Sequence, residues 1–180
     1  MARVYLSLGS NIDQQRYLRA ALDALQEKFG ELIISPVYES EAVGFDGDHF
    51  YNLVVGIDTT MPVGELSNDL RGIEERNDRT RTGSKFSSRT LDIDILTYGE
   101  ECGVIDGIEL PRDEILKYAF VLLPLVDIAG DAGHPSLKKS YRELWGAFGG
   151  DKSAAPQKLW RTEFSWQGKI ISKPEAGCQV

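Results

Sequence analysis

The stretch "SSRTLDIDIL", residues 87–96, decides the fold. Its apolar residues alternate with Asp92 and Asp94, and such alternation predicts a strand with one buried face. The two aspartates then share the opposite face, with their Cα atoms about 6.6 Å apart. Because aspartate is a poor strand former and two like charges repel each other, we expect a positively charged partner beside them.

The segments on either side of this strand predict the other strands and helices of the fold. Apolar residues at alternating or at three- and four-residue steps predict a strand at 4–8, a helix over 18–29, strands at 31–40 and 51–58, and a helix over 63–73. With the strand at 91–96 the order is βαββαβ, which predicts an α+β, ferredoxin-like fold with an antiparallel sheet and helices on one face. Short helices are expected over 111–130 and 140–148, followed by an irregular C-terminal extension.

The bulk composition predicts one soluble domain over residues 1–180. The hydrophobic fraction of 42% and charged fraction of 27% are ordinary for a globular protein. The net charge of −8 argues against nucleic acid and anionic membranes as partners. No apolar run has the length of a signal peptide or a membrane span, and two cysteines suggest no disulfide framework. We therefore expect a cytoplasmic protein.

Asp92 and Asp94 are candidate metal ligands. Carboxylates on one strand face can converge on one divalent ion or on two, and oxygen-only ligands suit Mg²⁺, which completes its shell with water and substrate phosphates. The alternative is an ordinary solvated strand face.

A basic segment precedes the strand. It contains Arg79, Arg81, Lys85 and Arg89, and arginine forks fit phosphate oxygens. A basic loop that leads into a metal-binding strand is what phosphoryl transfer requires. The alternative is that these cations pair with acidic residues nearby in the chain.

Three further residues suggest a site for a flat heterocycle. Phe50 and Phe120 could hold a ring between them, and the amide of Asn52 could bind its edge as both donor and acceptor. The alternative is that both phenylalanines belong to the core.

Four motifs together resemble one enzyme family. They are "LSLGSN" (6–11), "FYN" (50–52), "RTLDIDIL" (89–96) and "FVLLPL" (120–125). The resemblance, which covers about residues 3–135, is to 6-hydroxymethyl-7,8-dihydropterin pyrophosphokinase of folate biosynthesis. It implies a ferredoxin-like monomer that transfers pyrophosphate from ATP to the hydroxymethyl group of the pterin and releases AMP. Its partners would be these two small molecules.

The resemblance also implies roles for individual residues. Asp92 and Asp94 would hold two Mg²⁺ ions, and Arg79 and Arg89 would act with them on the phosphates. The implied pterin-binding residues are Val43, Phe50, Asn52 and Phe120, and the implied ATP-binding residues are Glu74, Arg79, Lys85, Arg89 and Arg112.

The chain departs from the family pattern on the ATP side. Arg112 and Tyr118 stand where family members commonly carry a histidine and an arginine, and Ser87-Ser88 replaces a Gly-Pro. These departures keep two alternatives open: a pterin-binding paralogue with weakened ATP binding, and another metal-dependent nucleotidyl transferase.

Overall fold

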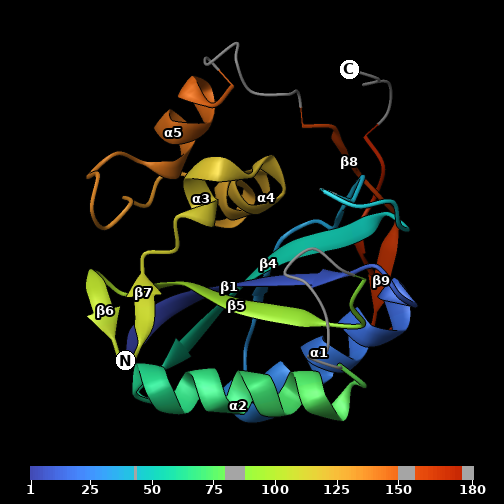
Figure 1. The fold of residues 1–180 in the computed structure, drawn as a ribbon, viewed down its shortest axis with the longest axis horizontal. Helices are drawn as coiled ribbons and strands as arrows, with labels where there is room; N and C mark the ends of the chain where they lie inside the picture. Colours follow the sequence, from blue (N-terminus) through green and yellow to red (C-terminus); the bar gives the residue numbers. More distant parts are fainter. Residues whose placement is uncertain (43, 80–87, 150–156, 176–180) are drawn as a thin grey trace.

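The computed structural model describes residues 1–42, 44–79, 88–149 and 157–175. Its centre is a six-stranded antiparallel sheet. The strands are β1 (Ala2–Ser10), β2 (Ile33–Ile34), β3 (Tyr38–Ser40), β4 (Phe50–Thr59), β5 (Asp92–Tyr98) and β8 (Leu159–Arg161). Their order is β5-β1-β4-β3-β8, with β2 also paired to β4, so the first five strands confirm the ferredoxin-like prediction (Figure 1).

The break between β2 and β3 has a local cause. Pro36 has no N–H to donate to a neighbouring strand. Beside it, the Ser35 hydroxyl accepts a hydrogen bond from Val54 N at 2.9 Å, where a backbone carbonyl would otherwise serve. The expected strand at 31–40 is therefore two short strands.

Two helices, α1 (Gln14–Phe29) and α2 (Val63–Arg76), cover one face of the sheet (Figure 1). Their apolar stripes pack on alternate residues of β1, β4 and β5, and this cluster forms the larger part of the core. Ile93 and Ile95 point into it. The alternation of the opening stretch thus places Asp92 and Asp94 on the opposite face.

That opposite face is also covered, by α3 (Glu114–Lys117), α4 (Ala119–Ala129) and α5 (Tyr141–Ala147). The prediction of helices on one face is right for α1 and α2 but incomplete. Because α4 is apolar nearly all round, it buries a second cluster against Val54 and Leu96. A hairpin of β6 (Gly103–Ile105) and β7 (Ile108–Leu110) leads from β5 to these helices.

The C-terminal extension is more regular than expected. β8 adds to the outer side of β3, and β9 (Phe164–Trp166) pairs with β10 (Lys169–Ser172) beside α1. Arg19 Nε donates to Ser165 O at 2.7 Å, and Phe164 is buried in the main core. These strands have three or four residues each, too few for a period to show in the sequence. Across the described ranges, no helix combines the length and apolarity of a bilayer span.

Candidate active site

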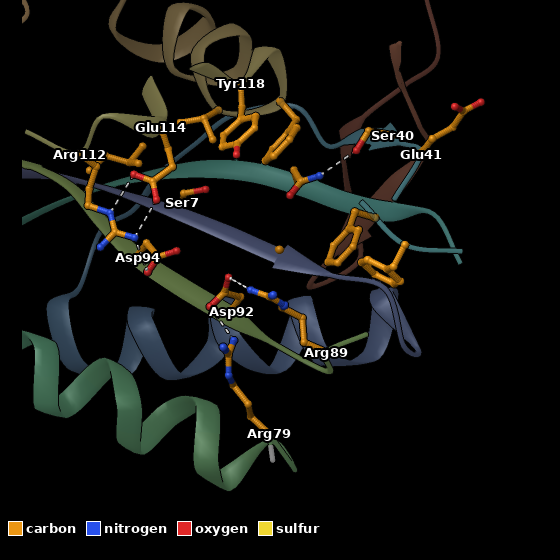
Figure 2. A pocket seen from close by; sticks show the side chains of 17 residues that line it. Ser7, Ser40, Glu41, Arg79, Arg89, Asp92, Asp94, Arg112, Glu114 and Tyr118 are labelled. Carbon is orange, nitrogen blue, oxygen red and sulfur yellow. Dashed lines mark hydrogen bonds and ion pairs between the residues drawn. The ribbon is translucent and has the colours of Figure 1, made fainter. Parts of the chain in front are cut away.

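A cavity of about 310 Å³ opens between the sheet and the helices α3 and α4 (Figure 2). Its size is typical of a small-molecule site. Eight residues predicted from the sequence line it: Phe50, Asn52, Arg79, Arg89, Asp92, Asp94, Arg112 and Phe120. Residues from segments more than 60 positions apart therefore face one space. Val43 and Lys85 lie outside the described residues.

Asp92 lies between two arginines (Figure 2). Arg79 Nη1 donates to Asp92 Oδ1 at 2.5 Å, and Arg89 Nη1 donates to Asp92 Oδ2 at 2.6 Å. The expectation of a positive partner is thereby confirmed. Arg79 Nη1 also lies 3.6 Å from Glu74 Oε1, so pairing with an acidic residue nearby in the chain contributes as well. Arg79 Nε is buried and has no hydrogen-bond acceptor in the described part of the chain.

Asp94 has a different environment from Asp92. It lies beside Arg112, whose Nη2 is 3.5 Å from Asp94 Oδ1 and 3.1 Å from Glu114 Oε1. Burial in the cavity and the nearby Asp92 carboxylate raise the pKa of Asp94 to about 7, although Arg112 opposes the shift. The Asp94 side chain keeps 40% of its surface exposed, so a ligand in the cavity can reach it.

Glu74 supports the strand that carries both aspartates. Its side chain is only 4% exposed, and Oε1 accepts a hydrogen bond from Ile93 N at 2.8 Å. Ile93 is the residue between Asp92 and Asp94. Glu74 is absent from the described lining of the cavity, and its nucleotide contact stays a prediction.

The "LGSN" motif holds two parts of the site together. A Cβ atom on Gly9 would lie 2.9 Å from Asn52 Oδ1, so any larger residue at this position would displace the amide. Asn11 is buried, and its Oδ1 accepts from Arg89 N at 2.7 Å. Asn11 N also donates to Arg89 O at 3.1 Å, which fixes the backbone of the arginine that contacts Asp92.

Aromatic rings line the other part of the cavity. Phe45 meets Phe50 edge to face, with ring centroids 6.3 Å apart. Tyr118 stacks on Phe120, with centroids 5.0 Å apart and planes at 16°. Asn52 Nδ2 donates to Ser40 Oγ at 3.3 Å (Figure 2). Both Phe50 and Phe120 line the cavity, and Phe120 also packs against the second core cluster, so their contact with a heterocycle stays a prediction.

Sequence reasoning missed several lining residues, among them Ser7, Phe45, Glu114 and the ring of Tyr118. Ser7 could have been found, because it is paired with Asp94 across β1 and β5. The other three come from connections and short helices, whose side chains have no periodic signal.

The described residues contain no group of three or more His, Cys, Asp or Glu side chains that could hold a metal ion. Asp92 and Asp94 alone supply two carboxylates on one strand face of the cavity. Such a donor set fits an ion that takes its remaining ligands from water and a phosphate.

Comparison with known proteins identifies the family. Residues 5–130 match the family model described as 7,8-dihydro-6-hydroxymethylpterin-pyrophosphokinase, HPPK. The chain belongs to the HPPK family. Two relatives named 2-amino-4-hydroxy-6-hydroxymethyldihydropteridine pyrophosphokinase agree. The one from Pseudomonas aeruginosa is 38% identical over 138 residues, 74% of this chain and 84% of its own. The relative from Aquifex aeolicus is 34% identical over 146 residues, which are 80% of this chain and 91% of the relative.

Solved structures support the HPPK fold. The wild-type HPPK-DHPS of Plasmodium falciparum matches 95% of this chain with a TM-score of 0.67 at 15% identity. Its complex with STZ-DHP matches with a TM-score of 0.69 at 14% identity, again over 95% of this chain. The chain spans about half the length of these structures, 50% and 48%. At such identities the likeness concerns the fold alone.

Proposed function

We propose that this HPPK family member transfers pyrophosphate from ATP to the hydroxymethyl group of 6-hydroxymethyl-7,8-dihydropterin and releases AMP, as a step of folate biosynthesis. The carrying observation is the cavity, which combines an aromatic end at Phe50 and Phe120 with a charged end at Asp92 and Asp94. In this proposal the protein acts as a cytoplasmic monomer whose partners are its two small-molecule substrates.

The aromatic end suits the pterin. Phe50 and Phe120 offer ring faces for a flat heterocycle, and aromatic pairs of this kind add about 0.5–1.5 kcal/mol beyond the area they bury. Asn52 is 5% exposed and keeps an amide N–H and its oxygen for the pterin edge. Backbone groups near Glu41, which also lines the cavity, would complete the recognition.

The charged end suits the triphosphate. Arg79, Arg89 and Arg112 line the cavity and pair there with Asp92, Asp94 and Glu114, so their guanidinium groups already lie where phosphate oxygens would bind. The buried Nε of Arg79 can donate to a phosphate oxygen once the guanidinium turns from Asp92. Asp92 and Asp94 would hold Mg²⁺, which supplies positive charge that stabilises the phosphate oxygens.

The chemical step is a displacement at the β-phosphorus of ATP. The pterin hydroxymethyl oxygen forms a bond to this phosphorus, the bond to the α-phosphate oxygen breaks, and the hydroxyl proton is lost to solvent. Arg79 and Arg89 bind and orient the phosphates, since phosphoryl transfer depends chiefly on positioning and charge stabilisation. The aromatic walls orient the attacking hydroxymethyl group.

The test is release of AMP from ATP and Mg²⁺, measured with hydroxymethyl dihydropterin present and omitted. The proposal expects AMP only when the pterin is present. Release of pyrophosphate in place of AMP would instead indicate a nucleotidyl transferase.

A second candidate is a pterin-binding paralogue with weakened ATP binding. Arg112 favours it, because this cation is already paired with Asp94 and Glu114, and Tyr118, which also lines the cavity, carries no positive charge. Calorimetry separates the two: pterin binding with no measurable heat for Mg²⁺-ATP would establish the paralogue. The Tyr118→Arg variant should then bind ATP more tightly than the wild type.

A further inference from the structure

The segment 157–161, named here the C-terminal strap, lies beyond the residues that match the family model. It includes β8, which is paired to β3, and it reaches both aromatic walls of the cavity. One wall carries Tyr118 and Phe120 at the start of α4, and the other carries Phe50 at the start of β4.

Gln157 contacts the first wall on both sides of Tyr118. Its Oε1 accepts a hydrogen bond from Ala119 N at 2.7 Å, and its Nε2 donates to Lys117 O at 2.8 Å. Tyr118 is the extended residue between α3 and α4, and no side chain of its own caps α4. Gln157 therefore supplies the missing cap and fixes the two peptide groups that orient the Tyr118 ring. That ring stacks on Phe120.

Trp160 contacts the second wall. Its Nε1 donates to Glu39 Oε2 at 3.2 Å, and Glu39 Oε1 lies 2.9 Å from His49 Nδ1. The His49 ring also meets the Trp160 ring edge to face at 5.6 Å. Since His49 directly precedes Phe50, the strap restrains the start of β4 as well.

A partly buried polar cluster joins the strap to the sheet and to α4. Arg161 donates to Tyr38 Oη from Nε at 3.0 Å and to Asp127 Oδ1 from Nη2 at 3.1 Å. Tyr38 Oη in turn donates to Asp127 Oδ2 at 2.5 Å. Because Tyr38 belongs to β3 and Asp127 to α4, their hydrogen bond links the sheet to the helix, and Arg161 joins the strap to both.

We infer that Gln157 is a positioning residue for the pterin site, which sets the orientation of the Tyr118–Phe120 wall without touching the substrate. This inference rests on the proposed function for the identity of the ligand. The effect of Gln157 on the placement of the wall does not depend on the ligand, because it follows from hydrogen bonds within the protein.

The experiment compares Gln157→Asn with Gln167→Asn in the full-length protein. Both changes shorten a glutamine of the C-terminal extension by one methylene. Gln167 donates to Gln26 on α1, away from the cavity, and its positive φ of 49° is one that asparagine tolerates. A third variant, Gln157→Glu, keeps an acceptor for Ala119 N–H and loses the donor to Lys117.

Two measurements are made on each variant. The first is hydrogen–deuterium exchange without ligand, in which Gln157→Asn should speed exchange at residues 118–122 while Gln167→Asn leaves it unchanged. The second is calorimetric binding of hydroxymethyl dihydropterin, whose Kd should rise about tenfold in Gln157→Asn, with less effect in Gln157→Glu. The Kd for Mg²⁺-ATP should stay within about twofold of the wild type, because ATP is expected at the charged end.

Equal exchange in the two asparagine variants would overturn the inference, and so would an unchanged pterin Kd in Gln157→Asn. A loss of pterin and ATP binding together would also overturn it, since that result indicates a general structural role. If the wild type binds no hydroxymethyl dihydropterin, the proposed function fails, whereas the exchange measurement still decides whether Gln157 holds the wall.

Discussion

Replacement of Glu74 by alanine tests how the aspartate strand is held. The buried Glu74 carboxylate accepts from Ile93 N at 2.8 Å, and alanine would leave this N–H without its acceptor. An unsatisfied buried donor costs about 1–3 kcal/mol. Arg79 keeps Asp92 as a partner, so loss of its 3.6 Å contact with Glu74 adds less. Truncation to alanine also removes the packing contacts of the Glu74 side chain, so we expect the free energy of unfolding to fall by about 2–4 kcal/mol in total.

Two companion variants sharpen this test. Glu74→Gln keeps an amide oxygen for Ile93 N–H and removes only the charge, so the expected loss is about 1 kcal/mol. Glu75→Ala is the matched control, because Glu75 is the next residue of the same helix and is exposed. Its effect should stay within about 0.5 kcal/mol.

The assay is urea denaturation, with the m-value checked for constancy across the three variants. For a chain of this length a melting scan should show about 2–4 °C for each kcal/mol lost. The reasoning is refuted if Glu74→Ala is no more destabilising than Glu75→Ala. Because Ile93 separates the two aspartates, Glu74→Ala should also lower AMP release at temperatures where it remains folded.

Three further predictions concern the site and the core. Asp92→Asn and Asp94→Asn should each lower the rate of AMP release by about 100-fold or more and raise the Mg²⁺ concentration for half-maximal rate, and full activity in both would exclude them as metal ligands. Phe120→Ala should raise the pterin Kd by about 10- to 100-fold with little change for ATP; equal losses for both ligands would contradict the stacking role. Burial lowers the pKa of His134, so the unfolded chain binds more protons and stability should fall as pH drops below about 6.5. His134→Gln should flatten this part of the urea-midpoint profile, and an unchanged slope would show that His134 is not its source.

The sequence predicted the parts of the site that follow from regular periodicity. Alternation at Asp92 and Asp94 fixed which strand face they occupy, and the structure confirms that the cavity lies on that face. The need for a positive partner followed from charge repulsion alone. Which arginine contacts which carboxylate did not follow, because Arg79 reaches Asp92 from the segment that follows α2.

The missed features depend on contacts between distant segments. Gln157 contacts the backbone beside Tyr118, about forty positions away in the chain, and no local sequence pattern predicts such a contact. β8 is visible only through its pairing with β3, since three residues show no alternation. The family resemblance implied only a nucleotide contact for Glu74, and its hydrogen bond with Ile93 N depends on tertiary structure that the sequence pattern does not show.

The short strand β8 also bears on how the protein avoids self-association. A sheet that ended at β3 would present unpaired backbone N–H and C=O groups to any extended chain, the usual template for edge-to-edge aggregation. β8 covers that side of β3, and as the new outermost strand it spans only Leu159–Arg161 and carries a charged residue. An edge strand this short is a poor template for further strands, so the residues of β8 that support the cavity also limit edge-to-edge aggregation.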